Sequence, residues 1–250
     1  MAVSSRLASR KRIGVIGDSH SLFCFCEVAE ASIFWRGPIS MHRVGRDGLL
    51  SVLPPKCRLS DYDALVIVFG EIDCRAHVPS IATRKGLSLD AVIEDLAVRY
   101  VAAIAAVRGG FSGPIAICCV IPPAGATLPL EPGEDMAVAV RGQVYIRRLL
   151  NARLRALGGA AGLLFVDFYD AYATATGELQ PSLSDGALLV SPKQTQAIVT
   201  ATAATLGLAL THKPIDRDVF LIPVGNYWRR RRQLVDVWFK AQLKRMTGRA

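Results

Sequence analysis

The stretch "IGVIGDSHSLF", residues 13–23, sets the fold expected for this 250-residue chain. Its first residues are apolar and partly β-branched, as in a buried strand, and Gly17 then marks a turn toward a helix. Asp18, Ser19 and His20 follow at the carboxyl end of that strand, where binding sites collect in open α/β sheets. Whether Ser19 works as a nucleophile there is the functional question that the sequence raises.

Similar apolar runs recur along the chain and alternate with helical patterns. Strands are predicted over residues 12–17, 39–44, 64–69, 115–121 and 163–168. Helices are predicted over residues 89–107, 138–157 and 192–206, the first two ending at the glycine pairs 109–110 and 158–159. The alternation predicts an α/β fold, with a mostly parallel sheet covered by helices. The Pro- and Gly-rich residues 122–135 are expected to form a long loop at the carboxyl end of the sheet.

The charge of the chain lies at its ends. The formal net charge is +9, yet residues 13–225 carry 18 basic and 20 acidic side chains. We therefore expect a basic lead over residues 1–12, a globular domain over residues 13–210 and a basic extension over residues 211–250. A general nucleic-acid groove through the domain is not expected. The lead has no apolar segment typical of a signal peptide, and no apolar run is long enough to span a membrane, so a cytoplasmic location is predicted.

Six cysteines lie mostly within apolar stretches and lack the paired CxxC spacing of zinc sites. They are predicted to be buried, reduced thiols. No metal and no cofactor is expected.

The segment "GEIDCRAH", residues 70–77, follows a predicted strand. Glu71, Asp73, Arg75 and His77 alternate with apolar residues, so an extended backbone would place all four on one face. Arg75 could simply neutralise the two carboxylates in a structural cluster. A functional cluster is favoured, because ionisable groups beyond a buried strand are costly unless they are paired or used.

Three blocks, "IGDSHS", "FGEIDCRAH" and "DGALLVSP", together resemble the SGNH/GDSL hydrolase family, in particular a bacterial branch with a GEIDCR block. The resemblance covers roughly residues 11–207. It implies a three-layer α/β/α sandwich around a five-stranded parallel, flavodoxin-like sheet. It also implies esterase, deacetylase or acyl-transfer chemistry.

The resemblance assigns roles to particular residues. Ser19 matches the nucleophile, with its own N–H in the oxyanion hole. Gly45 or Gly48, in "VGRDG", matches the glycine donor of the second block. Asp185 matches the acid of the last block, which in the family orients a histidine three or four residues further on.

The sequence departs from the family at two places. Leu188 and Leu189 stand where the general base is expected, and Ile72 stands where an asparagine donor is usual. A serine hydroxyl is a weak nucleophile unless a base takes its proton. Turnover several orders of magnitude lower is therefore expected, with roughly 10³-fold catalysis left from the oxyanion hole and binding.

Another histidine could replace the missing base. His20 adjoins the serine, and its side chain should point away, so we expect it to contact substrate instead. His77 could face Ser19 across the crevice, with Asp73 or Glu71 as its orienting carboxylate. The remaining histidines are expected at surface or structural positions: His42 and His212.

A metal-dependent alternative has weaker support. Asp18-x-His20 and residues 70–73 are loosely similar to ligand blocks of metallophosphoesterases, which hold two metals. The later histidine-rich blocks of that class are missing from the sequence.

Residues 226–246 can form an amphipathic helix with tryptophan and phenylalanine opposite lysine and arginine. Such a helix could dock on the domain and leave its charges in solvent. It could equally bind an anionic membrane surface or an acidic partner.

Two functions follow from the sequence. The first is a serine ester hydrolase with a degenerate triad and acylated carbohydrate as a candidate substrate. The second is a non-catalytic module of the same fold, which binds a glycan or acyl ligand and is recruited to a surface by its C-terminal helix. The intact "GDSH" and the polar cluster from Glu71 to His77 favour the enzyme, whereas Leu188 and Leu189 favour the binding module.

Overall fold

The computed structural model describes residues 11–213, apart from residues 56, 125–135 and 187. The chain divides into two units, residues 1–213 and residues 214–250. The predicted tail helix, most of the basic lead and most of the predicted loop at residues 122–135 lie outside the described residues. In the part that is described, no helix has the length and apolar character needed to cross a membrane.

Five parallel strands form one sheet in the order β2-β1-β3-β4-β5. The strands are β1 (Ile13–Gly17), β2 (Ala31–Trp35), β3 (Ala64–Val68), β4 (Ile115–Cys118) and β5 (Leu164–Val166). β1 lies inside the sheet, with Ile13 in register with Ala31 of β2 and Ala64 of β3. β1, β3 and β4 are buried throughout, because helices cover both faces of a parallel sheet, and they read as continuous apolar runs.

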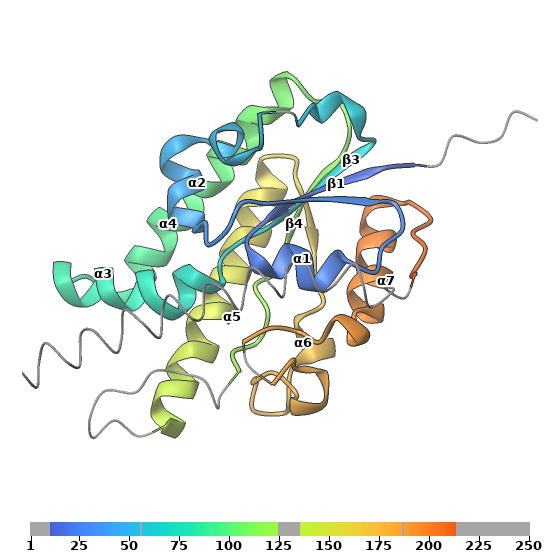
Figure 1. The fold of residues 1–250 in the computed structure, drawn as a ribbon. Helices are drawn as coiled ribbons and strands as arrows, with labels where there is room; N and C mark the ends of the chain where they lie inside the picture. The colour runs from blue at the N-terminus through green and yellow to red at the C-terminus, as the bar shows by residue number, and fades with distance from the viewer. Residues whose placement is uncertain (1–10, 56, 125–135, 187, 214–250) are drawn as a thin grey trace, which may run out of the picture. The chain divides into compact units, whose positions relative to one another are not determined.

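Helices lie on both faces of the sheet (Figure 1). One side carries α2 (Met41–Asp47), α3 (Val78–Lys85), α4 (Leu89–Ala105) and α5 (Met136–Ala160). The other side carries α1 (Ser19–Phe25), α6 (Tyr169–Tyr172) and α7 (Gln196–Leu206). Short 3₁₀ segments join them, including η1 (Leu49–Val52), η2 (Leu59–Asp61), η4 (Ala106–Gly109), η6 (Pro181–Leu183) and η7 (Pro192–Gln194).

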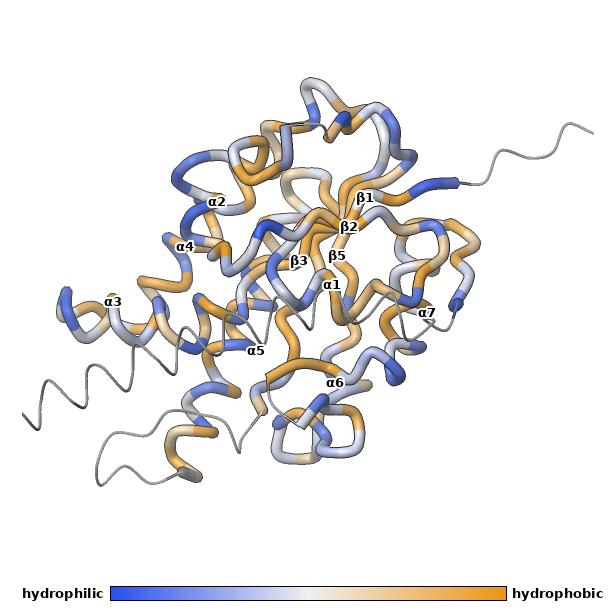
Figure 2. The backbone as a smooth tube through the Cα atoms, viewed as in Figure 1, coloured by the Kyte–Doolittle hydropathy of each residue, from blue (hydrophilic) through white to orange (hydrophobic). Residues whose placement is uncertain are grey.

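Alternate residues of each strand enter different cores, as the pleat requires. Ile16 and Ile67 pack under α2, α4 and α5, whereas Val15 and Val66 pack under α1 and α7. Figure 2 shows the apolar strands between the two helical layers. The three-layer sandwich with a five-stranded parallel sheet, predicted from the sequence, is confirmed.

The predicted strand at residues 39–44 was wrong. The second strand is β2, eight residues earlier, and residues 41–47 form α2. The Ser40 side chain accepts a hydrogen bond from Arg43 N at 3.2 Å and so caps the helix, while Met41 and Val44 are buried at helical spacing. Ser40 followed by Met41 and Val44, two apolar residues three positions apart, is the sequence pattern that indicates the start of a helix here.

The long helices are confirmed, with one end corrected. The predicted stop at residues 158–159 does not end α5, which runs to Ala160. The end comes where Gly162 adopts a φ of 72° and Leu163 N donates to Gly158 O at 2.8 Å. A left-handed glycine just past the last turn is the usual C-terminal cap, and two helical glycines inside the turn do not terminate it.

Candidate active site

The turn from β1 into α1 buries every polar side chain of "GDSHS" except one. Asp18 is the N-cap of α1, where its Oδ1 accepts a hydrogen bond from His20 N at 2.8 Å. Ser21 is fully buried and donates to Asp18 O at 2.7 Å. Ser19 is the first residue of α1 and is half-buried, and no hydrogen bond ties its hydroxyl to any residue that the structure describes. Within this turn, the Ser19 hydroxyl alone stays accessible.

Gly17 allows this turn to form. A Cβ at residue 17 would lie 2.3 Å from the Val68 carbonyl oxygen and 2.7 Å from Ser21 Cβ, so any side chain would clash. Glycine lets the ends of β1 and β3 approach closely, which brings the residues after β3 next to α1.

His20 is buried beside Asp18, with its Nδ1 3.2 Å from Asp18 Oδ1. Burial lowers the pKa of His20, but the negative charges of Asp18 and Glu71 outweigh burial, so the pKa lies above its ordinary value. The backbone carbonyl of Leu188 acts in the same direction, although no hydrogen bond of good geometry reaches Nε2 within the described part of the chain. The neighbouring carboxylates therefore favour the protonated form of this buried imidazole.

The extended backbone predicted for residues 71–77 was wrong. Residues 73–77 form a π-helical turn, η3 (Asp73–His77), which continues into α3. In a helical segment, residues four apart share a face, so Glu71 pairs with Arg75 and Asp73 pairs with His77. The four polar groups consequently divide into two pairs.

The Glu71 pair lies next to His20. Glu71 is buried, and Arg75 donates to it through Nε at 2.7 Å and a terminal nitrogen at 3.3 Å. A terminal nitrogen of Arg147, in α5, approaches Glu71 Oε1 to 3.7 Å. Burial raises the pKa of Glu71, but His20, Arg75 and Arg147 together hold it below its ordinary value. The Glu71 carboxylate is thus ionised, and the neighbouring cations balance its charge.

Arg147 was missed by sequence reasoning. It is 2% exposed, contacts the side-chain oxygen of Gln143, and leaves its Nε without a partner in the described region. The signal was present in the sequence, because Arg147 falls on the apolar stripe of α5, three residues before Leu150 and seven after Val140. A charge on a buried stripe implies a buried counter-charge, here Glu71.

The Asp73 pair ties η3 to α2. Asp73 is fully buried and accepts from Met41 N at 2.6 Å, His42 N at 3.0 Å and His77 Nδ1 at 3.1 Å. The hydrogen bond to Asp73 raises the pKa of His77 above its ordinary value. His42 stacks edge-on against His77, with ring centroids 6.1 Å apart.

The two pairs face different cavities. Asp18, His20 and Glu71 line a cavity of about 10 Å³ at the carboxyl ends of the strands, which is about the size that one water needs. His77 and Asp73 line another cavity, of about 240 Å³, between α2, α3 and α4. No hydrogen bond links Ser19 to an imidazole among the residues described.

Neither candidate oxyanion glycine is free to act. Gly45 lies inside α2 and packs on α4, where an added Cβ would come within 3.2 Å of Arg99 and Tyr100. The N–H of Gly48 donates to Val44 O at 2.9 Å as the end of that helix. The glycine just beyond the carboxyl end of β2 is Gly37, which has a φ of 104°.

Asp185 closes a tight turn. Its Oδ1 accepts from Leu189 N at 3.0 Å, and its own N–H donates to Leu189 O at 2.9 Å. Its side chain is exposed, and Leu189 is buried. The turn therefore presents the backbone carbonyl of Leu188 to His20 where the resemblance leads one to expect a histidine.

The described residues offer no cluster of metal ligands, and their cysteines are free thiols. No three His, Cys, Asp or Glu side chains there are grouped so as to hold a metal ion. The six cysteines are free thiols and most are buried, as predicted. Burial raises the pKa of Cys74 to about 12, so the thiol stays protonated and inert.

Comparison with solved structures shows the same fold in several bacterial proteins. A candidate platelet activating factor from Streptococcus pneumonia is 17% identical, with a TM-score of 0.56 over 81% of this chain and 86% of that one. A GDSL-like lipase from Bacteroides thetaiotaomicron is 12% identical, with a TM-score of 0.52 over 79% and 88%. A catalytic mutant of an acetylxylan esterase from Geobacillus stearothermophilus is 11% identical, with a TM-score of 0.51 over 80% and 95%. No family model and no curated protein matches the sequence.

Proposed function

We propose that the chain is a serine ester hydrolase in which Ser19 attacks the acyl carbon. One observation carries the proposal. In the turn at the carboxyl end of β1, Asp18 and His20 are buried and paired with each other, while the Ser19 hydroxyl is half-buried and accepts no hydrogen bond from the described residues. Solved structures with this fold include a lipase and an acetylxylan esterase, which fits the proposal.

The reaction needs a proton acceptor. Ser19 Oγ forms a bond to the ester carbonyl carbon while its proton passes to an imidazole, and the same proton then leaves with the alcohol as the acyl–oxygen bond breaks. Water next hydrolyses the acyl-enzyme. Two imidazoles are each oriented by a carboxylate, His77 by Asp73 and His20 by Asp18. His77 is the proposed base, because its ring is half-exposed and its Nδ1 is already held by Asp73.

The remaining predicted residues have supporting roles in this proposal. Glu71 and Arg75 neutralise each other beside His20 and fix the shape of the crevice. Asp185, which is exposed, is vestigial or contacts substrate. Acylated carbohydrate is the proposed substrate class, as for the acetylxylan esterase that shares the fold.

Covalent labelling tests the nucleophile. A fluorophosphonate probe should label the wild type and the Ser182→Ala control, whose serine lies on an exposed 3₁₀ turn, and should not label Ser19→Ala. Hydrolysis of 4-nitrophenyl acetate and of acetylated xylan should follow the same order. Equal labelling of wild type and Ser19→Ala, or none with no turnover, would contradict the proposal. If His77 is the base, His77→Gln should abolish the pH dependence of kcat and His20→Gln should retain it.

A second candidate is a non-catalytic module that binds a glycan or acyl ligand. It is favoured by Leu188 and Leu189 at the expected base position and by the lack of an imidazole bonded to Ser19 in the described residues. In this case Ser19→Ala would bind the ligand as tightly as wild type, and neither would turn it over. The basic residues 226–246 would then recruit the module to an anionic membrane surface or an acidic partner.

A further inference from the structure

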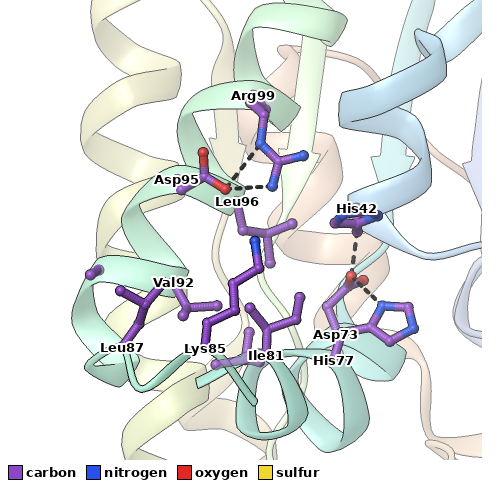
Figure 3. A pocket seen from close by; sticks show the side chains of 12 residues that line it. His42, Asp73, His77, Ile81, Lys85, Leu87, Val92, Asp95, Leu96 and Arg99 are labelled. Atoms are coloured by element: carbon purple, nitrogen blue, oxygen red, sulfur yellow. Dashed lines mark hydrogen bonds and ion pairs between the residues drawn. The ribbon is translucent and has the colours of Figure 1, made fainter. Parts of the chain in front are cut away.

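A second cavity lies apart from the one that Asp18, His20 and Glu71 line. It measures about 240 Å³ and lies between α2, the η3–α3 segment and α4 (Figure 3). None of its lining residues lines the smaller cavity beside Asp18, His20 and Glu71. Its volume exceeds the roughly 150 Å³ that suffices for an apolar cavity to bind benzene, so a small molecule fits inside.

One wall of this cavity is aliphatic and rigid. Val78, Val92 and Leu96 line it and belong to the buried core, with at most 6% of each residue exposed. Ile81 adds a further aliphatic surface from α3. Side chains packed in this way keep the cavity open, because none of them can rotate into it without leaving the core.

The polar wall has its carboxylates occupied and the ammonium of Lys85 available. Both oxygens of Asp73 accept hydrogen bonds, from Met41 N, His42 N and His77 Nδ1. Asp95 is paired with Arg99 at 2.5 Å. The ammonium of Lys85, by contrast, makes no hydrogen bond or ion pair with the described residues. Figure 3 shows the Lys85 side chain extending into the cavity toward Leu96, with His42 and His77 on the side of Asp73.

This distribution selects an anion with an apolar body. A cation would meet Lys85 and Arg99 and would find the Asp73 and Asp95 carboxylates already used. An anion would gain charge-assisted hydrogen bonds from Lys85 and an imidazole, while an aliphatic chain would cover the apolar wall.

We propose that the cavity between α2, α3 and α4 binds a small aliphatic carboxylate, with its head group on Lys85 and His77 and its chain against Val78, Ile81 and Leu96. Ser19 does not line the cavity, but His77 does, so a carboxylate bound here would contact the residue proposed as the base. Binding itself does not require ester hydrolysis, because Lys85 and the apolar wall take no part in the proposed reaction.

Titration of the full-length protein with hexanoate tests the proposal. Hexanoate should shift the imidazole NMR signals of His42 and His77 to saturation, whereas 1-hexanol at the same concentrations should bind about tenfold more weakly, because it lacks the charge. Lys85→Met should weaken hexanoate binding by about tenfold. Arg84→Met is the matched control, since Arg84 is the neighbouring exposed cation of α3 and does not line the cavity, and it should bind like wild type.

A variant that fills the cavity gives a second test of hexanoate binding. Ala91 is exposed at the mouth of the cavity in the first turn of α4, so Ala91→Trp should block binding and leave the thermal midpoint close to that of wild type. The proposal is overturned if hexanoate leaves the imidazole signals unchanged, or if hexanol binds as tightly as hexanoate. It is also overturned if Lys85→Met and Arg84→Met weaken binding equally, since attraction to the general basic surface would then account for the effect.

Discussion

His20 couples the candidate site to the stability of the fold through its proton. The imidazole is buried, yet its pKa is raised, because Asp18 and Glu71 stabilise the cation more than burial destabilises it. The folded protein therefore holds the proton at pH values where the unfolded chain, with an ordinary pKa of 6.5, has released it. Between those two pKa values the native state binds more protons, so stability falls as pH rises.

This sign gives a prediction for His20→Gln. The wild type should have its full contribution from His20 below pH 6.5 and lose it as the pH rises through the folded-state pKa. The variant should lack that part of the slope, while the part from His77 remains, because the pKa of His77 is raised as well. Urea unfolding of both proteins at several pH values from 5.5 to 9 (about one per half unit) measures the difference. Parallel profiles would show that His20 is not held as a cation.

Arg147 is a single charged residue that changes what the apolar stripe of α5 contacts. Read by itself, the apolar stripe of α5 predicts an all-aliphatic contact with the sheet. The arginine on that stripe instead reaches Glu71 at 3.7 Å, and the two charges neutralise each other in the interior. Removing one partner of such a pair leaves a buried charge without its counter-charge, which destabilises the fold.

Among the elements, the passage from β3 into η3 decides where the polar pairs point. Gly70 has a φ of 124°, and a Cβ there would lie 2.5 Å from Val120 Cγ2 and 2.9 Å from Met41 Cε. Only glycine adopts that conformation readily, and only glycine leaves room for Val120, just beyond β4, and for Met41 of α2. The chain turns from a strand into a helix within two residues, so polar side chains that share a face are four residues apart and not two.

Gly70→Ala should therefore lower the free energy of unfolding by about 2–4 kcal/mol, from backbone strain and overpacking together. Gly142→Ala is the matched control. It changes an exposed glycine inside α5 with nothing within 4 Å of the new methyl, so it should raise stability by up to about 1 kcal/mol. Urea unfolding measures both. Similar small effects from the two variants would mean that the turn can relax without cost.

At the scale of the whole molecule, the described residues form two hydrophobic clusters, one on each face of the sheet, with members from β1 to just beyond α7. The last described residues are bound to the rest of the domain by two polar contacts. His212 Nε2 lies 2.7 Å from the buried Glu27 carboxylate, and Thr211 N donates a hydrogen bond to the Glu30 side chain at 2.8 Å. Residues 214–250 form a separate unit of the chain.

A chain that ends at Lys213 should consequently unfold in one cooperative transition, with a free energy of unfolding within about 1 kcal/mol of the full-length protein. The same truncation should abolish co-sedimentation with phosphatidylserine vesicles, because eight of the nine charged side chains in residues 226–250 are basic. A loss of several kcal/mol would instead mean that the tail packs on the domain. Vesicle binding that survives truncation would place the membrane contact elsewhere.

The sequence by itself determined the fold class, because it depends on local patterns: apolar runs long enough for buried strands, helical spacing between them, and glycines that punctuate both. It also located Ser19 correctly at the end of the first strand, since "IGVIGDSH" contains both the strand and its turn. The position of the second strand was lost because β2 is only half-buried along its length, and its signal is correspondingly weak.

Only the tertiary structure decided which polar groups meet. Glu71 and His77 are six residues apart, yet one faces α1 and α5 and the other faces α2 and α4, because the chain between them is helical and not extended. The meeting of His20 with Leu188 and of Glu71 with Arg147 joins segments far apart in the chain. Such contacts depend on how the layers pack, and no local pattern encodes the partner that a buried charge will find.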